Sequence, residues 1–226
     1  MPLILNIETA TEVCSVALAH DGKLLSIRES KDGFTHSENI TVFISEVISD
    51  GNISLNELAA IAVSKGPGSY TGLRIGVSTS KGLCFALDKP LIAVPTLQAL
   101  TFGAIKKLSI ANRQLSILFS PMIDARRMEV YCAVFDSELN EVEPTSAKII
   151  SENSFEKLLA SNTVYFFGSG AAKCKSIIKH PNAVFIEDVF ATAASMISLS
   201  EKLFGAEKFE DAAYFEPFYL KDFVAK

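Results

Sequence analysis

Two carboxylates stand at turns where they could serve phosphoryl chemistry. Glu8 directly follows the apolar run Leu3–Ile7, and Asp124 ends the apolar run that begins at residue 115. At such a junction a carboxylate can orient Mg²⁺ or a water molecule. It can equally accept hydrogen bonds within its own turn, which is a purely structural role. Glu8 and Asp124 are therefore candidates for a nucleotide cleft, and neither is assigned a catalytic role.

A Gly-x-Gly turn follows each carboxylate later in the chain. These turns are Gly66-Pro67-Gly68 and Gly168-Ser169-Gly170. Glycine adopts positive φ and lets a backbone approach a phosphate closely. The Walker spacing G-x-x-x-x-G-K-[ST] is absent. The glycines at both ends of each turn complete the set of cleft candidates.

Metal-ligating residue types are present, but their spacing does not suit a metal site. Two histidines four residues apart on a helix would place both imidazoles on one face. The three histidines are His20, His36 and His180, and the residue four after His36 is Ile40. The four cysteines lack C-x-x-C spacing and are expected to be buried, reduced thiols. No nucleophile elbow is visible, so we predict no metal site, no cofactor and no catalytic residue in this chain.

The stretch 58–87 predicts a buried strand, a glycine turn and a helix from about residue 71 to residue 87. On this helix Gly72, Gly76 and Ser80 recur every four residues and share one face. Mid-helix glycine costs about 1 kcal/mol relative to alanine, so the stripe indicates that another backbone comes close. Three interpretations stay open: a phosphate loop at the helix N-terminus, tight packing of the helix on its own sheet, and a close helix–helix interface with a partner.

A second helix is predicted from about residue 37 to residue 49. Its apolar residues fall at i, i+3, i+4, i+7 and i+8, which is the amphipathic pattern. They are Ile40, Phe43, Ile44, Val47 and Ile48. Part of this face must cover the sheet, and the remainder is available to a partner.

Composition limits the compartment and the kinds of partner. The chain of 226 residues is 49% hydrophobic, which is ample for a core. No apolar run is long enough to span a membrane. The start lacks a basic region and Glu8 interrupts its apolar run, so we expect no signal peptide and predict a cytoplasmic protein. The net charge of −5 argues against this chain holding a phosphate backbone by itself.

The two halves of the chain repeat one order of elements: three strands, a helix, a strand, a Gly-x-Gly turn, a helix, a strand and a helix. Glu8 and Asp124 occupy the same place in this order, and so do the two glycine turns. We infer an α/β fold built by internal duplication of a βββαβα unit. An amino-terminal lobe would span residues 1–108 and a carboxy-terminal lobe residues 109–226. The aromatic tail, residues 215–223, is expected to dock on the protein.

Four segments resemble the TsaB family of bacterial proteins, which is required for the threonylcarbamoyladenosine (t6A) modification of tRNA. The segment GPGSYTGLRIGVSTSKGL (66–83) is long and specific. LILNIETATEVCSVAL (3–18), MIDARRMEVYCAV (122–134) and Tyr219-Leu220-Lys221 fit the same family in order. The resemblance implies the actin-like ATPase fold of sugar kinases, heat-shock ATPases and actin, which the duplicated unit also matches.

The resemblance further implies a non-catalytic protein that forms a heterodimer with a TsaD-like catalytic subunit through helices 37–49 and 71–87. That subunit would transfer the threonylcarbamoyl group to N6 of adenosine 37 in tRNAs. A TsaE-like ATPase, ATP and a TsaD-bound metal are implied for the complex, and tRNA would be reached only through it. The residues expected at the interface are Ile40, Phe43, Ile44, Val47, Gly72, Gly76 and Ser80. Without its partner the chain could form a homodimer through the same surface.

The alternative function is a small ATP-dependent phosphotransferase of the same fold, which would use Glu8 and the two glycine turns. Arg126 and Arg127, close to Asp124, fit either function. Their guanidinium groups can pair with phosphate or with the carboxylates of a partner. The sequence assigns them no role.

Overall fold

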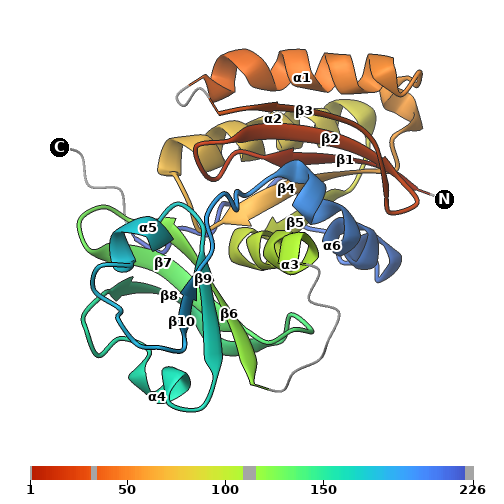
Figure 1. Cartoon of the computed structure of the whole chain (residues 1–226). Helices are drawn as coiled ribbons and strands as arrows, with labels where there is room; N and C mark the ends of the chain where they lie inside the picture. Colours follow the sequence, from red (N-terminus) through yellow and green to blue (C-terminus); the bar gives the residue numbers. More distant parts are fainter. Residues whose placement is uncertain (1, 32–34, 109–115, 222–226) are drawn as a thin grey trace. The chain divides into compact units, whose positions relative to one another are not determined.

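The computed structural model describes residues 2–31, 35–108 and 116–221. It contains two compact units (Figure 1). The first unit comprises residues 1–99 and 191–226, and the second comprises residues 100–190. Each unit holds one five-stranded sheet.

The sheet of the first unit has the strand order β3-β2-β1-β4-β5. Its strands are β1 (Leu3–Glu8), β2 (Cys14–His20), β3 (Lys23–Ser30), β4 (Ala60–Gly66) and β5 (Leu91–Pro95). The first three are antiparallel neighbours, whereas β4 runs parallel to β1 and β5 parallel to β4. Asp21 and Gly22 both have positive φ in the turn between β2 and β3. This is the backbone that a tight two-residue hairpin requires.

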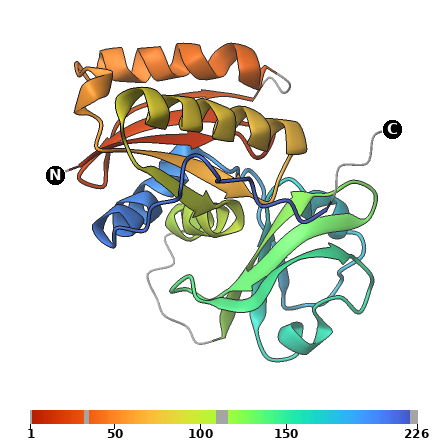
Figure 2. The ribbon, with the colours of Figure 1, turned by 180° about the vertical axis from the view of Figure 1, so that it is seen from behind.

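Helices α1 (His36–Asp50), α2 (Tyr70–Leu87) and α6 (Ala193–Gly205) cover the faces of this sheet. The short 3-10 helix η1 (Leu55–Glu57) precedes β4, and α3 (Thr96–Leu108) follows β5, beginning in the first unit and ending in the second. α1 and α2 lie side by side on one face (Figure 2), where they confirm the helices predicted at 37–49 and 71–87. α6 packs on the opposite face.

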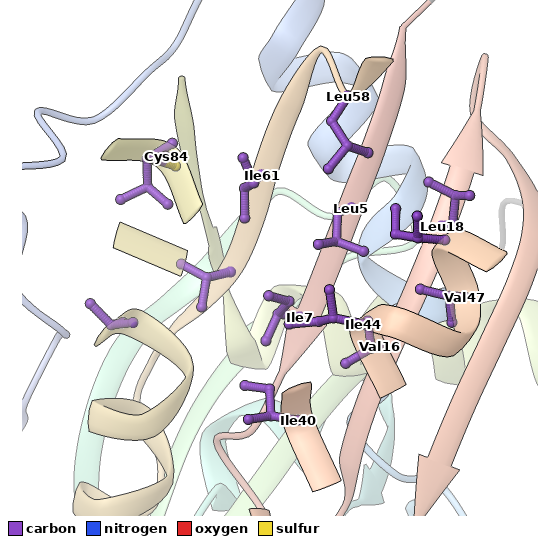
Figure 3. Packing of buried hydrophobic residues seen from close by; sticks show 14 of the residues in the cluster. Leu5, Ile7, Val16, Leu18, Ile40, Ile44, Val47, Leu58, Ile61 and Cys84 are labelled. Carbon is purple, nitrogen blue, oxygen red and sulfur yellow. The ribbon is translucent and has the colours of Figure 1, made fainter. Parts of the chain in front are cut away.

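Alternation along the strands supplies both packing layers, because successive strand side chains point to opposite faces. Leu5 and Ile7 are fully buried in the cluster under α1 and α2 (Figure 3). Ile4 belongs instead to the cluster that contains Met196 of α6. The central strand β1 is therefore buried on both faces, as the apolar run at the start of the chain predicts, and Asn6 is a buried polar residue within it.

The sheet of the second unit has the order β10-β9-β6-β7-β8, which is the same arrangement read from the other edge. Its elements are β6 (Ile117–Asp124), β7 (Glu129–Phe135), β8 (Glu141–Ile149), α4 (Glu156–Leu159), β9 (Thr163–Phe167), α5 (Ala171–Cys174) and β10 (Ala183–Phe185). Residue 115, the predicted start of its first strand, lies outside the described residues. The shared order confirms the predicted duplication of a βββαβα unit. α4 and α5 are single turns.

The compact units differ from the predicted lobes 1–108 and 109–226, because α6 returns to the first sheet. Oγ of Ser200 donates a 2.7 Å hydrogen bond to Oδ1 of Asn6, and both residues are fully buried. The tail beyond α6 also belongs to the first unit. The backbone N of Phe218 donates to the carbonyl of Lys65 at 2.7 Å, so the described part of the tail docks as expected. Phe223 lies outside the described residues.

The four cysteines, Cys14, Cys84, Cys132 and Cys174, are buried and free, as predicted. Burial raises the pKa of the Cys14, Cys84 and Cys132 thiols to about 11. A thiol with so high a pKa is almost wholly protonated at neutral pH and is a poor nucleophile. No helix within the described ranges has the length and apolar character needed to cross a membrane.

Candidate functional site

The first of the two predicted carboxylates, Glu8 at the end of β1, is enclosed by its own turn. Its side chain is fully buried. Oε1 accepts hydrogen bonds from the backbone N of Ala10 at 2.6 Å and from Oγ of Ser64 at 2.8 Å. The backbone N of Thr9 donates to Ser64 Oγ at 3.5 Å. Glu8 therefore ties the β1–β2 turn to β4, which is the structural role left open by its sequence position.

The second oxygen of Glu8 lacks such support. Oε2 is buried and has no hydrogen-bond partner among the described residues. Desolvation raises the pKa of Glu8 from 4.5 to about 7, and the hydrogen bonds to Oε1 offset only part of that rise. The neutral acid is the form that this enclosure favours. A buried carboxyl whose pKa is raised is poorly placed to hold Mg²⁺, which prefers ionised oxygen ligands.

The glycine turn of the first unit is packed against the chain's own backbone. Gly66 has a φ of +109°, and a Cβ built on it would lie 2.7 Å from the carbonyl oxygen of Phe218. A Cβ on Gly68 would overlap the carbonyl oxygen of Ala10. Ser69 N donates to that same carbonyl at 2.7 Å. The structure therefore gives Gly66, Gly68 and Glu8 packing roles rather than the predicted places in a nucleotide cleft.

The small-residue stripe of α2 also faces inward. A Cβ on Gly72 would overlap the carbonyl oxygen of Thr9, and one on Gly76 would overlap Thr9 Oγ1. Thr9 Oγ1 donates to the carbonyl of Gly72 at 2.8 Å, and Ser80 Oγ donates to the carbonyl of Gly76 at 2.8 Å. Gly72, Gly76 and Ser80 are all buried. Their assignment to a partner interface is thus contradicted, because the backbone that approaches the stripe belongs to the same unit.

The apolar face of α1 gives a similar correction. Ile40, Ile44 and Val47 are buried in the core beneath the helix (Figure 3), with exposed fractions of 2%, 7% and 0%. They cannot reach a partner because they already cover the sheet. Phe43 is half-buried at the edge of the same cluster and stays a candidate.

An exposed surface remains on the outer side of these two helices, which we call the outer α1–α2 face. It is formed by Val42 of α1 and by Ser78, Gly82, Phe85 and Ala86 of α2. Phe85 is 92% exposed and Val42 is 50% exposed. A Cβ on Gly82 would meet no atom within 4 Å. Sequence reasoning missed this face, although helical periodicity places it opposite the buried residues.

The second carboxylate, Asp124 at the end of β6, stands in an exposed copy of the same turn. Oδ1 of Asp124 accepts from the backbone N of Arg126 at 2.6 Å, which repeats the bond from Ala10 to Glu8. It also accepts from Nζ of Lys173 at 2.9 Å. The backbone N of Asp124 donates to Oγ of Ser169 at 3.2 Å. Asp124, Ser169 and the adjacent arginines Arg126 and Arg127 are exposed to solvent.

The glycine turn of the second unit repeats the close approach seen in the first. Gly168 has a φ of +95°, and its Cβ would lie 2.5 Å from the carbonyl oxygen of Met122. A Cβ on Gly170 would lie 3.1 Å from the backbone N of Asp124. Gly168 and Gly170 therefore pack on the end of β6. They leave only the exposed side chains around Asp124 available to a ligand.

The described residues contain no group of three or more His, Cys, Asp and Glu side chains that could hold a metal ion. His36 is buried at the start of α1, with Nε2 at 2.9 Å from the carbonyl oxygen of Thr11. That contact gives His36 a structural partner.

The comparisons with known proteins lead to one group of related proteins. Residues 33–226 match the family profile described as TsaD, tRNA N6-adenosine threonylcarbamoyltransferase. The tRNA threonylcarbamoyladenosine biosynthesis protein TsaB of Escherichia coli (strain K12) is 32% identical over 98% of this chain and 96% of its own length. The tRNA N6-adenosine threonylcarbamoyltransferase of Staphylococcus haemolyticus (strain JCSC1435) is 41% identical, but over only 41% of this chain and 32% of its own length.

Among solved structures, YeaZ from Pseudomonas aeruginosa has a TM-score of 0.83 to this chain. The match covers 97% of this chain and 100% of that chain at 23% sequence identity. This likeness shows the fold. Together with the two equivalent sheets, it confirms the predicted α/β fold built from two copies of one unit.

The buried carboxyl predicts a stability profile that depends on pH. A pKa raised from 4.5 to about 7 means that the unfolded chain releases this proton first. The contribution of Glu8 to the free energy of unfolding is therefore fully present below about pH 4.5 and falls as the pH rises to about 7. Above that pH it is constant, and the total loss is on the order of 3 kcal/mol. Glu8→Gln should remove this fall. Urea denaturation at pH 5 and pH 8 measures it, and Glu12→Gln, an exposed change in the same turn, should keep the wild-type difference. Equal pH dependence in Glu8→Gln and wild type would contradict the assignment.

The two kinds of glycine on α2 predict opposite effects of one substitution. Gly72→Ala should destabilise the protein by about 2 kcal/mol or more, because its methyl group meets the Thr9 carbonyl. Gly82→Ala should stabilise it by about 1 kcal/mol, because the new methyl group has space and alanine favours the helix. Urea midpoints of both variants test the pair. A Gly72→Ala variant as stable as wild type would refute the packing argument.

Proposed function

The chain belongs to the TsaB family of tRNA threonylcarbamoyladenosine biosynthesis proteins, and we propose that within this pathway it is the non-catalytic partner of a TsaD-like transferase subunit. One observation carries the proposal: the identity of 32% to the E. coli TsaB protein extends over 98% of this chain and 96% of that protein. The match to the transferase from S. haemolyticus covers only 32% of that protein. The similarity to the transferase is therefore confined to a segment that the two proteins share, and it does not extend over the whole of either chain.

The enclosed first turn supports a non-catalytic role. Glu8 is buried, its turn is filled by Thr9 and Ala10, and Gly68 packs on the Ala10 carbonyl. A nucleotide phosphate has no access to these groups without a rearrangement of the turn. This geometry also weighs against the alternative function, a small ATP-dependent phosphotransferase.

The outer α1–α2 face supports the proposed mode of partner binding. The phenyl ring of Phe85 is almost wholly exposed, and Gly82 one turn away has no Cβ to hold a second backbone off. Small and aromatic residues together permit close helix packing around an apolar anchor. We propose that this face, with Phe43 at its edge, replaces the buried residues first expected at the interface. A standard interface would bury about 1,600 Å² in total.

The rest of the proposed assembly follows from the family. ATP and the metal would belong to the TsaD-like subunit and to a TsaE-like ATPase, and tRNA would be engaged by the complex in the cytoplasm. When the partner is missing, the same face could pair with itself as a symmetric homodimer.

Reconstitution of the modification tests the function. We expect t6A to form on unmodified tRNA when this chain is combined with TsaD-like and TsaE-like proteins, ATP, threonine and the enzyme that makes threonylcarbamoyl-adenylate. Omission of this chain should reduce the product to background, measured by mass spectrometry of the digested tRNA. Equal t6A without the chain would refute the proposal. Calorimetry with Mg-ATP on the isolated chain would then decide for the phosphotransferase if it gave a micromolar Kd.

A substitution on the outer α1–α2 face tests the interface. Gly82→Leu should leave the monomer folded, because the space around this position is open. It should weaken heterodimer formation at least tenfold, equivalent to about 1.4 kcal/mol, by holding the partner helix away. Size-exclusion chromatography and calorimetry with the TsaD-like subunit measure this loss.

The matched control for this test is Gly205→Leu. Gly205 is also a helical glycine of the first unit with no atom within 4 Å of a built Cβ, but it ends α6. It should not affect the heterodimer. Normal co-elution of the Gly82→Leu variant would place the interface elsewhere.

A further inference from the structure

Because of the internal duplication, the turn that follows Glu8 and the turn that follows Asp124 can be compared directly. Both turns make the same hydrogen bond, from the backbone N two residues after the carboxylate to its side-chain oxygen. In the first copy the residues at and after that position are Ala10 and Thr11, whereas in the second they are Arg126 and Arg127. The first copy is enclosed and contains no basic side chain. The second is exposed and basic.

The backbone at the two arginines is unfavourable for this residue type. Arg126 and Arg127 have φ angles of 71° and 49°. Long side chains are uncommon in this left-handed region, which glycine and asparagine occupy more readily. Ala10 and Thr11 are not among the positive-φ residues, so the shared hydrogen bond does not itself demand this conformation. Strained residues of this kind gather at functional sites.

The positive charge of both arginines is uncompensated. Asp124 is the nearest acidic side chain in the turn, and its Oδ1 already accepts from Lys173 at 2.9 Å. Neither guanidinium group has a hydrogen bond or ion pair to another residue in the described part of the chain. Both side chains are exposed to solvent.

The net charge of the chain is unevenly divided between its two units. The net charge of −5 lies entirely in the first unit, because residues 100–190 contain equal numbers of basic and acidic side chains. The second unit is thus the part of the chain that a polyanion can approach. Adjacent guanidinium groups suit phosphate oxygens, which they bind through paired N–H donors.

We propose that Arg126 and Arg127 form a contact site for the phosphodiester backbone of RNA. The inference rests on the proposed function, because the tRNA substrate is the polyanion that the pathway supplies. Oγ of Ser169 in the neighbouring glycine turn, which accepts from Asp124 N, offers its hydroxyl proton as a further donor. This site would add two phosphate contacts to whatever the catalytic subunit provides.

The test uses the complex of the full chain with the TsaD-like subunit and a labelled, unmodified tRNA transcript. The variant is Arg126→Asn/Arg127→Asn, since asparagine tolerates the left-handed backbone. It should weaken tRNA binding about tenfold or more at physiological salt and reduce the slope of log K against log salt concentration by about 1.5. Its melting temperature should be unchanged or higher. A lower melting temperature would make the arginines structural and overturn the proposal.

A matched control removes the same charge elsewhere in the second unit. Lys157 and Lys179 are exposed, so Lys157→Gln/Lys179→Gln should change tRNA affinity less than twofold. An equal loss in this control, or none in the arginine variant, would refute the site.

Loss of co-elution with the TsaD-like subunit in the arginine variant would assign the pair to a protein's carboxylates instead. If the wild-type complex forms no t6A, the proposed function fails and this inference with it. Wild-type t6A formation with unchanged variant affinity refutes the RNA site alone.

Discussion

The contact between Thr9 and helix α2 is the constraint on which the first unit depends. The carbonyl and Oγ1 of Thr9 occupy the space that side chains at positions 72 and 76 would need, and Oγ1 donates to the Gly72 carbonyl at 2.8 Å. Only glycine permits such an approach of a turn to a helix. Because Thr9 directly follows Glu8, the same contact closes the turn over the carboxylate. It also determines which face of α2 points away from the sheet.

The second unit shows what the turn becomes without that closure. Its helix α5 is a single turn that contains no glycine, unlike α2 with its glycine stripe. Asp124 is exposed and pairs with Lys173 instead of being desolvated as Glu8 is. The two copies therefore share the hydrogen bond to the carboxylate and differ in solvent access. They also differ in backbone conformation, because Arg126 and Arg127 have positive φ whereas Ala10 and Thr11 do not.

Hydrophobic periodicity and the repeated order of elements were the basis of most of the fold prediction. The apolar residues of α1 and the repeated order of elements led to the correct helices and to two sheets of equal topology. The unit boundary did not follow, because α6 comes after β10 in sequence and packs on β1, a pairing that only tertiary structure determines.

The candidate site was predictable only in part, and the reason is physical. A glycine stripe signals that a backbone comes close, but it does not say whether that backbone belongs to the same chain. Here it belongs to Thr9, 63 residues before Gly72. The burial of Glu8 was hidden for a similar reason, because a carboxylate after a strand looks the same whether its turn is open or covered.

The two sides of helix α2 differ in how closely they are packed. On the inner side, any atom added at Gly72 or Gly76 meets Thr9, so this side determines whether the unit folds. On the outer side, Gly82 leaves space and Phe85 exposes 92% of its surface to water. Burial of a phenylalanine side chain is worth about 2 kcal/mol, a gain that this chain forgoes in isolation. A partner that covers Phe85 would recover that free energy without disturbing the inner contact, so the interface that we propose is compatible with a chain that folds alone.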